Sequence, residues 1–110
     1  MPRFCFIALV MLALAPAPAQ GSTERLTAAE LAKMCNSTSD VDYGFCGGYI
    51  TAIADAMSKA PGTGACHHAH VRSQQYIEVF RSYAELYPEK MSVEAKSAVA
   101  ASLARAFPCR

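Results

Sequence analysis

The stretch CNSTSDVDYGFC, residues 35–46, decides how this chain folds. Its polar centre, Asn36 to Asp40, consists of turn formers, and apolar residues at helical spacing precede and follow it. Cys35 therefore falls at the end of one predicted helix, and Cys46 falls in the first turns of the next. The stretch predicts a tight connection between two helices, with a cysteine on either side of it.

Working outward, the sequence predicts four helices and no strand. Thr27 and Glu30 form a capping box, in which each side chain can satisfy a backbone N–H of the other residue, so the first helix begins there. The other three helices are expected at about 41–59, 70–86 and 92–107. Their predicted buried faces are Phe45, Tyr49, Ile50, Ile53, Ala56 and Met57; Val71, Tyr76, Val79, Phe80, Tyr83 and Leu86; and Ala95, Val99, Leu103, Ala106 and Phe107.

Residues 1–19 have the pattern of an export signal. Arg3 is followed by an apolar run from Phe4 to Ala15, which is shorter than the ~20 residues that span a bilayer, and Ala17-Pro-Ala19 is a small-x-small cleavage pattern. We expect residues 1–19 to be a signal peptide and residues 20–110 to form one domain in the periplasm, with no membrane attachment after cleavage.

Charge and size limit the function further. The chain has 10 Lys and Arg against 9 Asp and Glu, and loss of Arg3 with the signal leaves nine of each. A nucleic-acid-binding domain normally carries a basic excess, so no nucleic-acid partner is expected. A domain of 91 residues buries only a modest core, which makes disulfides a useful addition in an oxidising compartment.

The four cysteines beyond the signal can pair in three ways, and helix geometry favours one of them. In a small up-and-down four-helix bundle, Cys35 and Cys46 lie at one end, whereas Cys66 and Cys109 follow the second and fourth helices at the other. A disulfide joins Cα atoms ~6 Å apart, and the helix after Cys46 is already ~20 Å long. The fold class predicted is all-α, with Cys35–Cys46 and Cys66–Cys109 bridges.

The segment Cys66-His-His-Ala-His70 has the residue types of a zinc or copper site. A periplasmic metal or small-ligand binder that uses His67, His68 and His70 is therefore one alternative function. The competing interpretation assigns Cys66 to a disulfide and leaves the histidines solvated. No pairing of nucleophile and base is evident, so the sequence predicts neither an enzyme nor a bound cofactor.

The order of short motifs along the chain resembles the Rap/Tai immunity-protein family. The motifs are Cys46-Gly-Gly-Tyr-Ile50, Tyr87-Pro-Glu89 and Phe107-Pro-Cys109, with Cys66 between the first two. Members of that family are small exported helical proteins that protect bacteria against the peptidoglycan amidase effectors of type VI secretion systems. This chain departs from the family at His67, His68 and Arg72, where members often carry an apolar residue, a proline and a threonine.

The resemblance implies a protein that binds a secreted amidase toxin and occludes its active site, without catalysis of its own. Two loops are candidates for insertion into the partner, 38–43 and 62–70, because loops between helices can enter a cleft. The candidate contact residues are Asp40, Asp42, Tyr43, His67, His68 and His70. A homodimer is compatible with the resemblance. A further alternative is an envelope protein that has no toxin partner.

Overall fold

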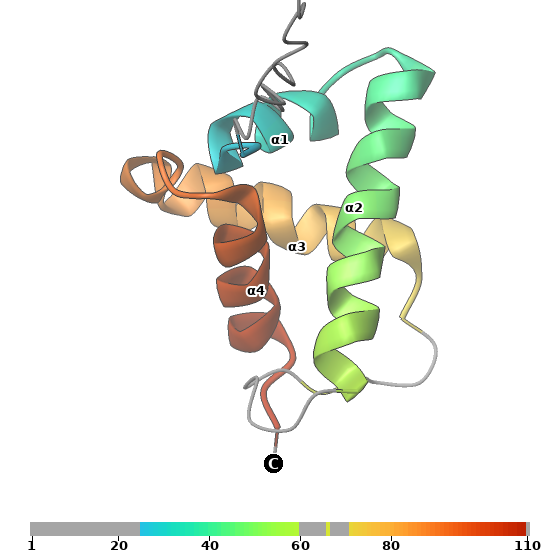
Figure 1. Ribbon diagram of the computed structural model, residues 1–110, viewed down its shortest axis with the longest axis vertical. Coiled ribbons are helices and arrows are strands. Elements are labelled where there is room, and N and C mark those ends of the chain that lie inside the picture. The colour runs from blue at the N-terminus through green and yellow to red at the C-terminus, as the bar shows by residue number, and fades with distance from the viewer. Residues whose placement is uncertain (1–24, 60–65, 67–70, 110) are drawn as a thin grey trace, which may run out of the picture.

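The computed structural model describes residues 25–59, 66 and 71–109, and these residues form four α-helices and no strand (Figure 1). The helices are α1 (Ala28–Cys35), α2 (Asp40–Lys59), α3 (Ser73–Leu86) and α4 (Ala95–Ala106), and a 3-10 turn, η1 (Pro88–Lys90), follows α3. The predicted all-α class with four helices is confirmed. α3 begins at Ser73 rather than near position 70, because Val71 and Arg72 are not helical and Arg72 is the N-cap.

The helices enclose one core. In Figure 1, α2 and α4 run in the same direction, α3 crosses behind both of them, and α1 lies across their N-terminal ends. Every pair of helices is in contact. The largest fully buried side chains come from all four helices: Phe80, Leu31, Ile50, Leu103, Val99, Cys35, Cys46 and Ser102. The Ser102 hydroxyl donates to the Val99 carbonyl at 2.7 Å, so this buried polar group is satisfied.

The beginnings of α1 and α4 are tied together by backbone hydrogen bonds. The Ala28 N–H donates to the Val93 carbonyl at 2.8 Å, and the Ala95 N–H donates to the Leu26 carbonyl at 2.8 Å. The predicted capping box is present: Thr27 Oγ1 accepts from the Glu30 N–H at 3.2 Å, and Glu30 Oε2 accepts from the Thr27 N–H at 2.9 Å. N–H groups that a free helix end would leave unpaired are therefore satisfied.

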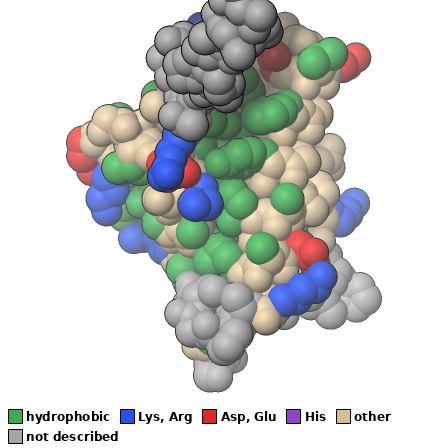
Figure 2. All heavy atoms as spheres, in the orientation of Figure 1, with side chains coloured by type: hydrophobic (Ala, Val, Ile, Leu, Met, Phe, Trp, Pro, Cys, Tyr) green, Lys and Arg blue, Asp and Glu red, His purple; other side chains and the backbone are tan. Residues whose placement is uncertain are grey.

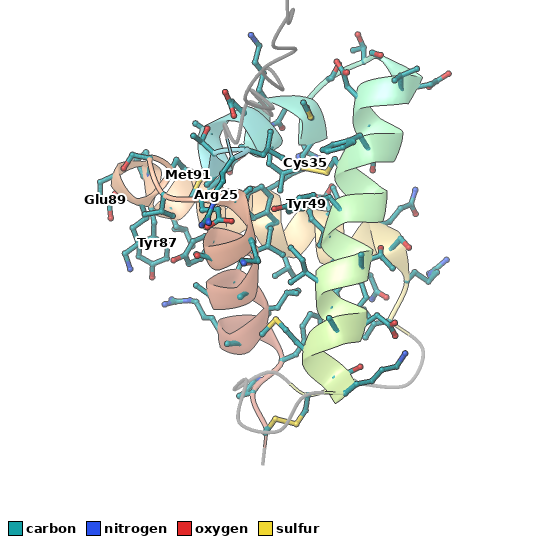
Figure 3. The ribbon with its side chains drawn as sticks, viewed as in Figure 1. Arg25, Cys35, Tyr49, Tyr87, Glu89 and Met91 are labelled. Carbon is teal, nitrogen blue, oxygen red and sulfur yellow. A yellow bond between two sulfur atoms is a disulfide. The ribbon has the colours of Figure 1, made fainter. Side chains whose placement is uncertain are left out.

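The two predicted disulfides are confirmed, and Figure 3 shows them at opposite ends of the molecule. Cys35 and Cys46 have Cα atoms 5.2 Å apart and are buried between α1 and α2. Cys66 and Cys109 have Cα atoms 5.0 Å apart and are both exposed. The Cys66 N–H also donates to the Phe107 carbonyl at 2.9 Å, which ties Cys66 to the end of α4.

Four residues predicted to be buried lie on the surface instead. Phe45 is 49% exposed, Leu86 is 65% exposed, and Ala56 and Ala106 are also exposed. The apolar stripe of α2 is wider than the strip that the other helices cover, so its edge at Phe45 and Ala56 faces solvent. Leu86 is the last residue of α3, where the helix extends past its neighbours.

Candidate functional site

The structure places the predicted contact residues Asp40, Asp42 and Tyr43 in the first turn of α2. Asp40 is exposed, the Asp42 carboxylate accepts from the Ser37 hydroxyl at 3.1 Å, and Tyr43 is half-buried against the core. Both carboxylates also interact favourably with the dipole at the start of a helix. The first turn of α2 therefore offers two acidic groups to a partner, while much of Tyr43 packs inward. The predicted residues His67, His68 and His70 lie outside the described residues.

The turn before α2 has little freedom, because several short bonds hold it. The Ser39 N–H donates to Ser37 Oγ at 3.1 Å, and the Tyr43 N–H donates to the Ser39 carbonyl at 2.9 Å. The buried Cys35–Cys46 disulfide joins the two helices on either side. A surface hollow of about 810 Å³ lies beside this turn, lined by Leu26, Glu30, Lys33, Met34, Asn36, Ser37, Thr38 and Asp42. A preformed surface loses less conformational entropy when it binds a partner.

The outer face of α2, defined by Val41, Phe45, Gly48 and Ala52, is apolar and uncovered by other described residues. Val41 is 80% exposed, and the Phe45 ring lies 5.9 Å from that of Tyr49. In Figure 2, hydrophobic side chains lie at the surface between α2 and α4. Sequence reasoning assigned Phe45 to the core and missed the outer face of α2. The absence of any charged residue between Asp42 and Asp55 was the available signal, because a helix with one solvated face normally carries charges there.

A groove of about 360 Å³ lies between the C-terminal halves of α3 and α4. Its lining is mostly apolar, with one serine and one charged side chain on each helix: Glu78, Val79, Ser82, Tyr83, Leu86, Ser102, Arg105 and Ala106. We call it the α3–α4 groove. Glu78 is paired with Arg81 at 2.7 Å, so its charge is balanced. Sequence reasoning did not predict this groove, since it depends on how two helices far apart in the chain are placed.

Beside the groove, two cations contact one tyrosine ring. Lys90 Nζ lies 4.6 Å from the centroid of Tyr87, and Arg105 Cζ lies 5.3 Å from it. The Tyr83 ring packs against the same ring, with centroids 4.9 Å apart. Figure 3 shows Tyr87 projecting from the end of α3. Cation–π contacts of this kind fix the positions of the two charges.

The phenol of Tyr49, a residue of α2, has a raised pKa. Burial, and then the nearby Glu94 carboxylate, raise the pKa of the Tyr49 phenol above its ordinary value of 10.0, while a hydrogen bond with the Lys96 backbone acts in the opposite direction. Glu94 itself is paired with Arg25 at 3.1 Å. Tyr49 is therefore a neutral phenol at physiological pH, suited to packing and hydrogen bonding.

Residues 25–59, 66 and 71–109 contain no group of three or more His, Cys, Asp or Glu side chains placed to hold a metal ion. None of the helices in those residues is long and apolar enough to cross a membrane. The described residues present three surface features: an acidic helix start, an apolar helix face, and an apolar groove with cations beside it.

Comparison with known proteins identifies the family. No curated protein sequence and no solved structure is significantly similar to the chain. The family model of the Rap1a immunity proteins matches residues 27–109, from the capping box of α1 to the last cysteine, which covers all four helices and both disulfides. The chain therefore belongs to the family of Rap1a immunity proteins.

Proposed function

We propose that this protein is exported to the periplasm and there neutralises an amidase effector of a type VI secretion system by binding over its active site. The family match across residues 27–109 carries this proposal, because immunity proteins act by binding a protein effector. The apolar run at residues 4–15, and the cleavage pattern that follows it, support export.

The molecule is suited to inhibition by contact. One disulfide lies at each end of the molecule, and all four helices contact one another in the core. The surfaces are therefore held in one arrangement before binding. Hydrogen bonds hold the turn before α2 in place, so this turn and the acidic start of α2 could enter a cleft of the partner without reordering. Inhibition of this kind requires shape complementarity and exclusion of substrate, and no bond is made or broken by the inhibitor.

The proposal is tested in cells and with purified proteins. A candidate amidase directed to the periplasm should lyse the host, and co-expression of the full chain should restore growth. The chain from Gln20, which lacks the leader and stays in the cytoplasm, should fail to protect. In vitro, the oxidised protein should abolish peptidoglycan hydrolysis at a stoichiometric ratio. Amidase activity that persists at saturating protein would contradict the proposal.

We also propose that the protein forms a homodimer, independently of how it binds the effector. The uncovered apolar outer face of α2 supports it, since apolar helix faces without a covering element are common at subunit interfaces. Sedimentation equilibrium of the exported protein should give twice the chain mass at micromolar concentration. A monomer at all concentrations tested would reject the dimer and leave effector binding unaffected.

A further inference from the structure

The α3–α4 groove combines an exposed apolar residue with a cation. Leu86 lines the groove and is 65% exposed, which is unusual for a leucine that stands beside a concave apolar surface. Arg105 lines the same groove and reaches the Tyr87 ring. An apolar hollow and a fixed positive charge are therefore next to each other on one surface.

The two cations beside the groove have no anionic partner among the described residues. No described carboxylate lies within 4.0 Å of Lys90 Nζ or of the Arg105 guanidinium, and both groups lie over the Tyr87 ring. Glu89 is in the same turn as Lys90, but it points away from Tyr87 (Figure 3). Within the part of the chain that the structure describes, neither cation is in a salt bridge.

The two charges are also close together. Both lie within 5.3 Å of one ring centroid, so they are at most about 10 Å apart. That separation is comparable with the Debye length of ~8 Å at physiological ionic strength, so their repulsion is only partly screened. An anion bound beside the two cations at the edge of the Tyr87 ring would relieve this repulsion and could accept charge-assisted hydrogen bonds from them.

We propose that the α3–α4 groove is a docking surface for an acidic segment of a protein partner, which places an apolar side chain against Leu86 and a carboxylate beside Arg105, with Lys90 nearby on the same tyrosine ring. Charge complementarity argues for this occupant, since two cations lie beside the groove and the one acidic residue of the groove, Glu78, is already paired with Arg81. The inference rests on the proposed function in one respect, that the partner is a protein, and it names the chemistry that the partner must present.

Nuclear magnetic resonance tests the groove without any effector. The labelled protein, expressed from the full chain and recovered after export, is titrated with acetyl-Phe-Asp-Glu-amide, with the neutral peptide acetyl-Phe-Asn-Gln-amide, and with inorganic phosphate. The acidic peptide should shift the Leu86 methyl and Arg105 side-chain signals saturably, and the neutral peptide should bind at least about tenfold more weakly. R105Q should abolish the shifts, whereas K33Q, which removes an exposed cation on α1, should retain them.

Three results would overturn the inference: no saturable shift at the groove, equal binding of the two peptides, or phosphate binding as tight as that of the acidic peptide, which would indicate an anion site only. Circular dichroism of R105Q establishes that the variant is folded, as expected for an exposed residue.

A second measurement separates this inference from the proposed function. With an amidase that the wild-type protein binds, R105Q combined with L86S should weaken the affinity by at least about tenfold, as expected at the centre of an interface. Unchanged affinity would reject the groove as the docking surface and leave the immunity function standing. If the wild type binds no amidase, the immunity function fails, and the peptide titration alone decides the groove.

Discussion

Ile77 packs so closely on Gly47 that a Cβ added to this glycine would lie 3.3 Å from Ile77 Cδ1. Ile77 is 2% exposed, so its side chain has little room to move away. The backbone of α2 therefore touches a side chain of α3 where the two helices cross. The next residue, Gly48, has open space around the same position, with no atom within 4 Å. The two glycines are adjacent in sequence and differ in what the tertiary structure requires of them.

This difference predicts opposite effects of alanine at the two positions. G48A should raise the free energy of unfolding by about 0.5–1 kcal/mol, because alanine favours the helix and meets no neighbour. G47A should lose that gain and lower stability, since Ile77 must shift in a packed core. Urea unfolding of the two oxidised variants measures both values. A G47A protein as stable as G48A would show that α3 adjusts freely at the crossing.

Two phenylalanines that the sequence places on helical apolar stripes should respond very differently to truncation. F80A should destabilise the protein by about 3–5 kcal/mol, because Phe80 is fully buried and its loss leaves a cavity. F45A should cost about 1 kcal/mol or less, since Phe45 is 49% exposed and loses mainly its ring contact with Tyr49. Thermal unfolding measures both changes. A large loss in F45A would mean that a second copy or another element covers the outer face of α2 in solution.

The two disulfides should differ in their accessibility to a reductant. Cys66 and Cys109 are both exposed, whereas Cys35 is 1% exposed and Cys46 is fully buried. A low concentration of dithiothreitol should therefore open Cys66–Cys109 first, because thiol–disulfide exchange needs access to a sulfur atom. Alkylation followed by peptide mass mapping at successive times gives the order. Simultaneous opening of both bridges would show that the domain unfolds before either one is reduced.

Removal of the buried bridge should cost the protein much of its stability. A C35A/C46A double variant should lose about 2–4 kcal/mol, since the bridge restricts the unfolded chain. That loss is a large part of the net stability of a small domain. The C66A/C109A variant is the matched comparison, and denaturant unfolding of both gives the two contributions. No loss in C35A/C46A would mean that packing between α1 and α2 alone holds this end.

The raised pKa of Tyr49 predicts a loss of stability in alkali. Because the folded protein holds this proton more tightly than the unfolded chain does, the contribution is fully present below pH 10.0 and is lost as the pH rises through the folded-state pKa. E94Q should lower the pKa of Tyr49 towards 10.0, since Glu94 is the charged group that raises it. The difference in absorbance near 295 nm between each protein and its Y49F variant isolates this titration. E89Q, which removes an exposed carboxylate elsewhere, should leave the Tyr49 pKa unchanged.

Local signals in the sequence were sufficient for the number and order of the helices, although α3 and α4 begin at Ser73 and Ala95 and not near positions 70 and 92. The Thr27–Glu30 capping box fixed where α1 begins, and the turn formers from Asn36 to Asp40 predicted the break between α1 and α2, although Asp40 is already the first residue of α2. The disulfide pairing followed from the rise of a helix together with an assumed up-and-down bundle, which put Cys35 and Cys46 at one end and Cys66 and Cys109 at the other. The capping box and the turn formers act between residues a few positions apart, so they need no knowledge of the packing.

The contact surfaces depended on tertiary structure. Whether Phe45 is buried, whether Gly47 can accept a side chain, and where Arg105 meets Tyr87 are decided by elements that lie next to one another only after folding. Apolar periodicity shows that a helix has a buried side, but not how much of that side its neighbours cover. The sequence by itself determined four helices and their two covalent links. Only the crossing of α3 over α2 and α4 determined which apolar and charged groups remain on the surface for a partner.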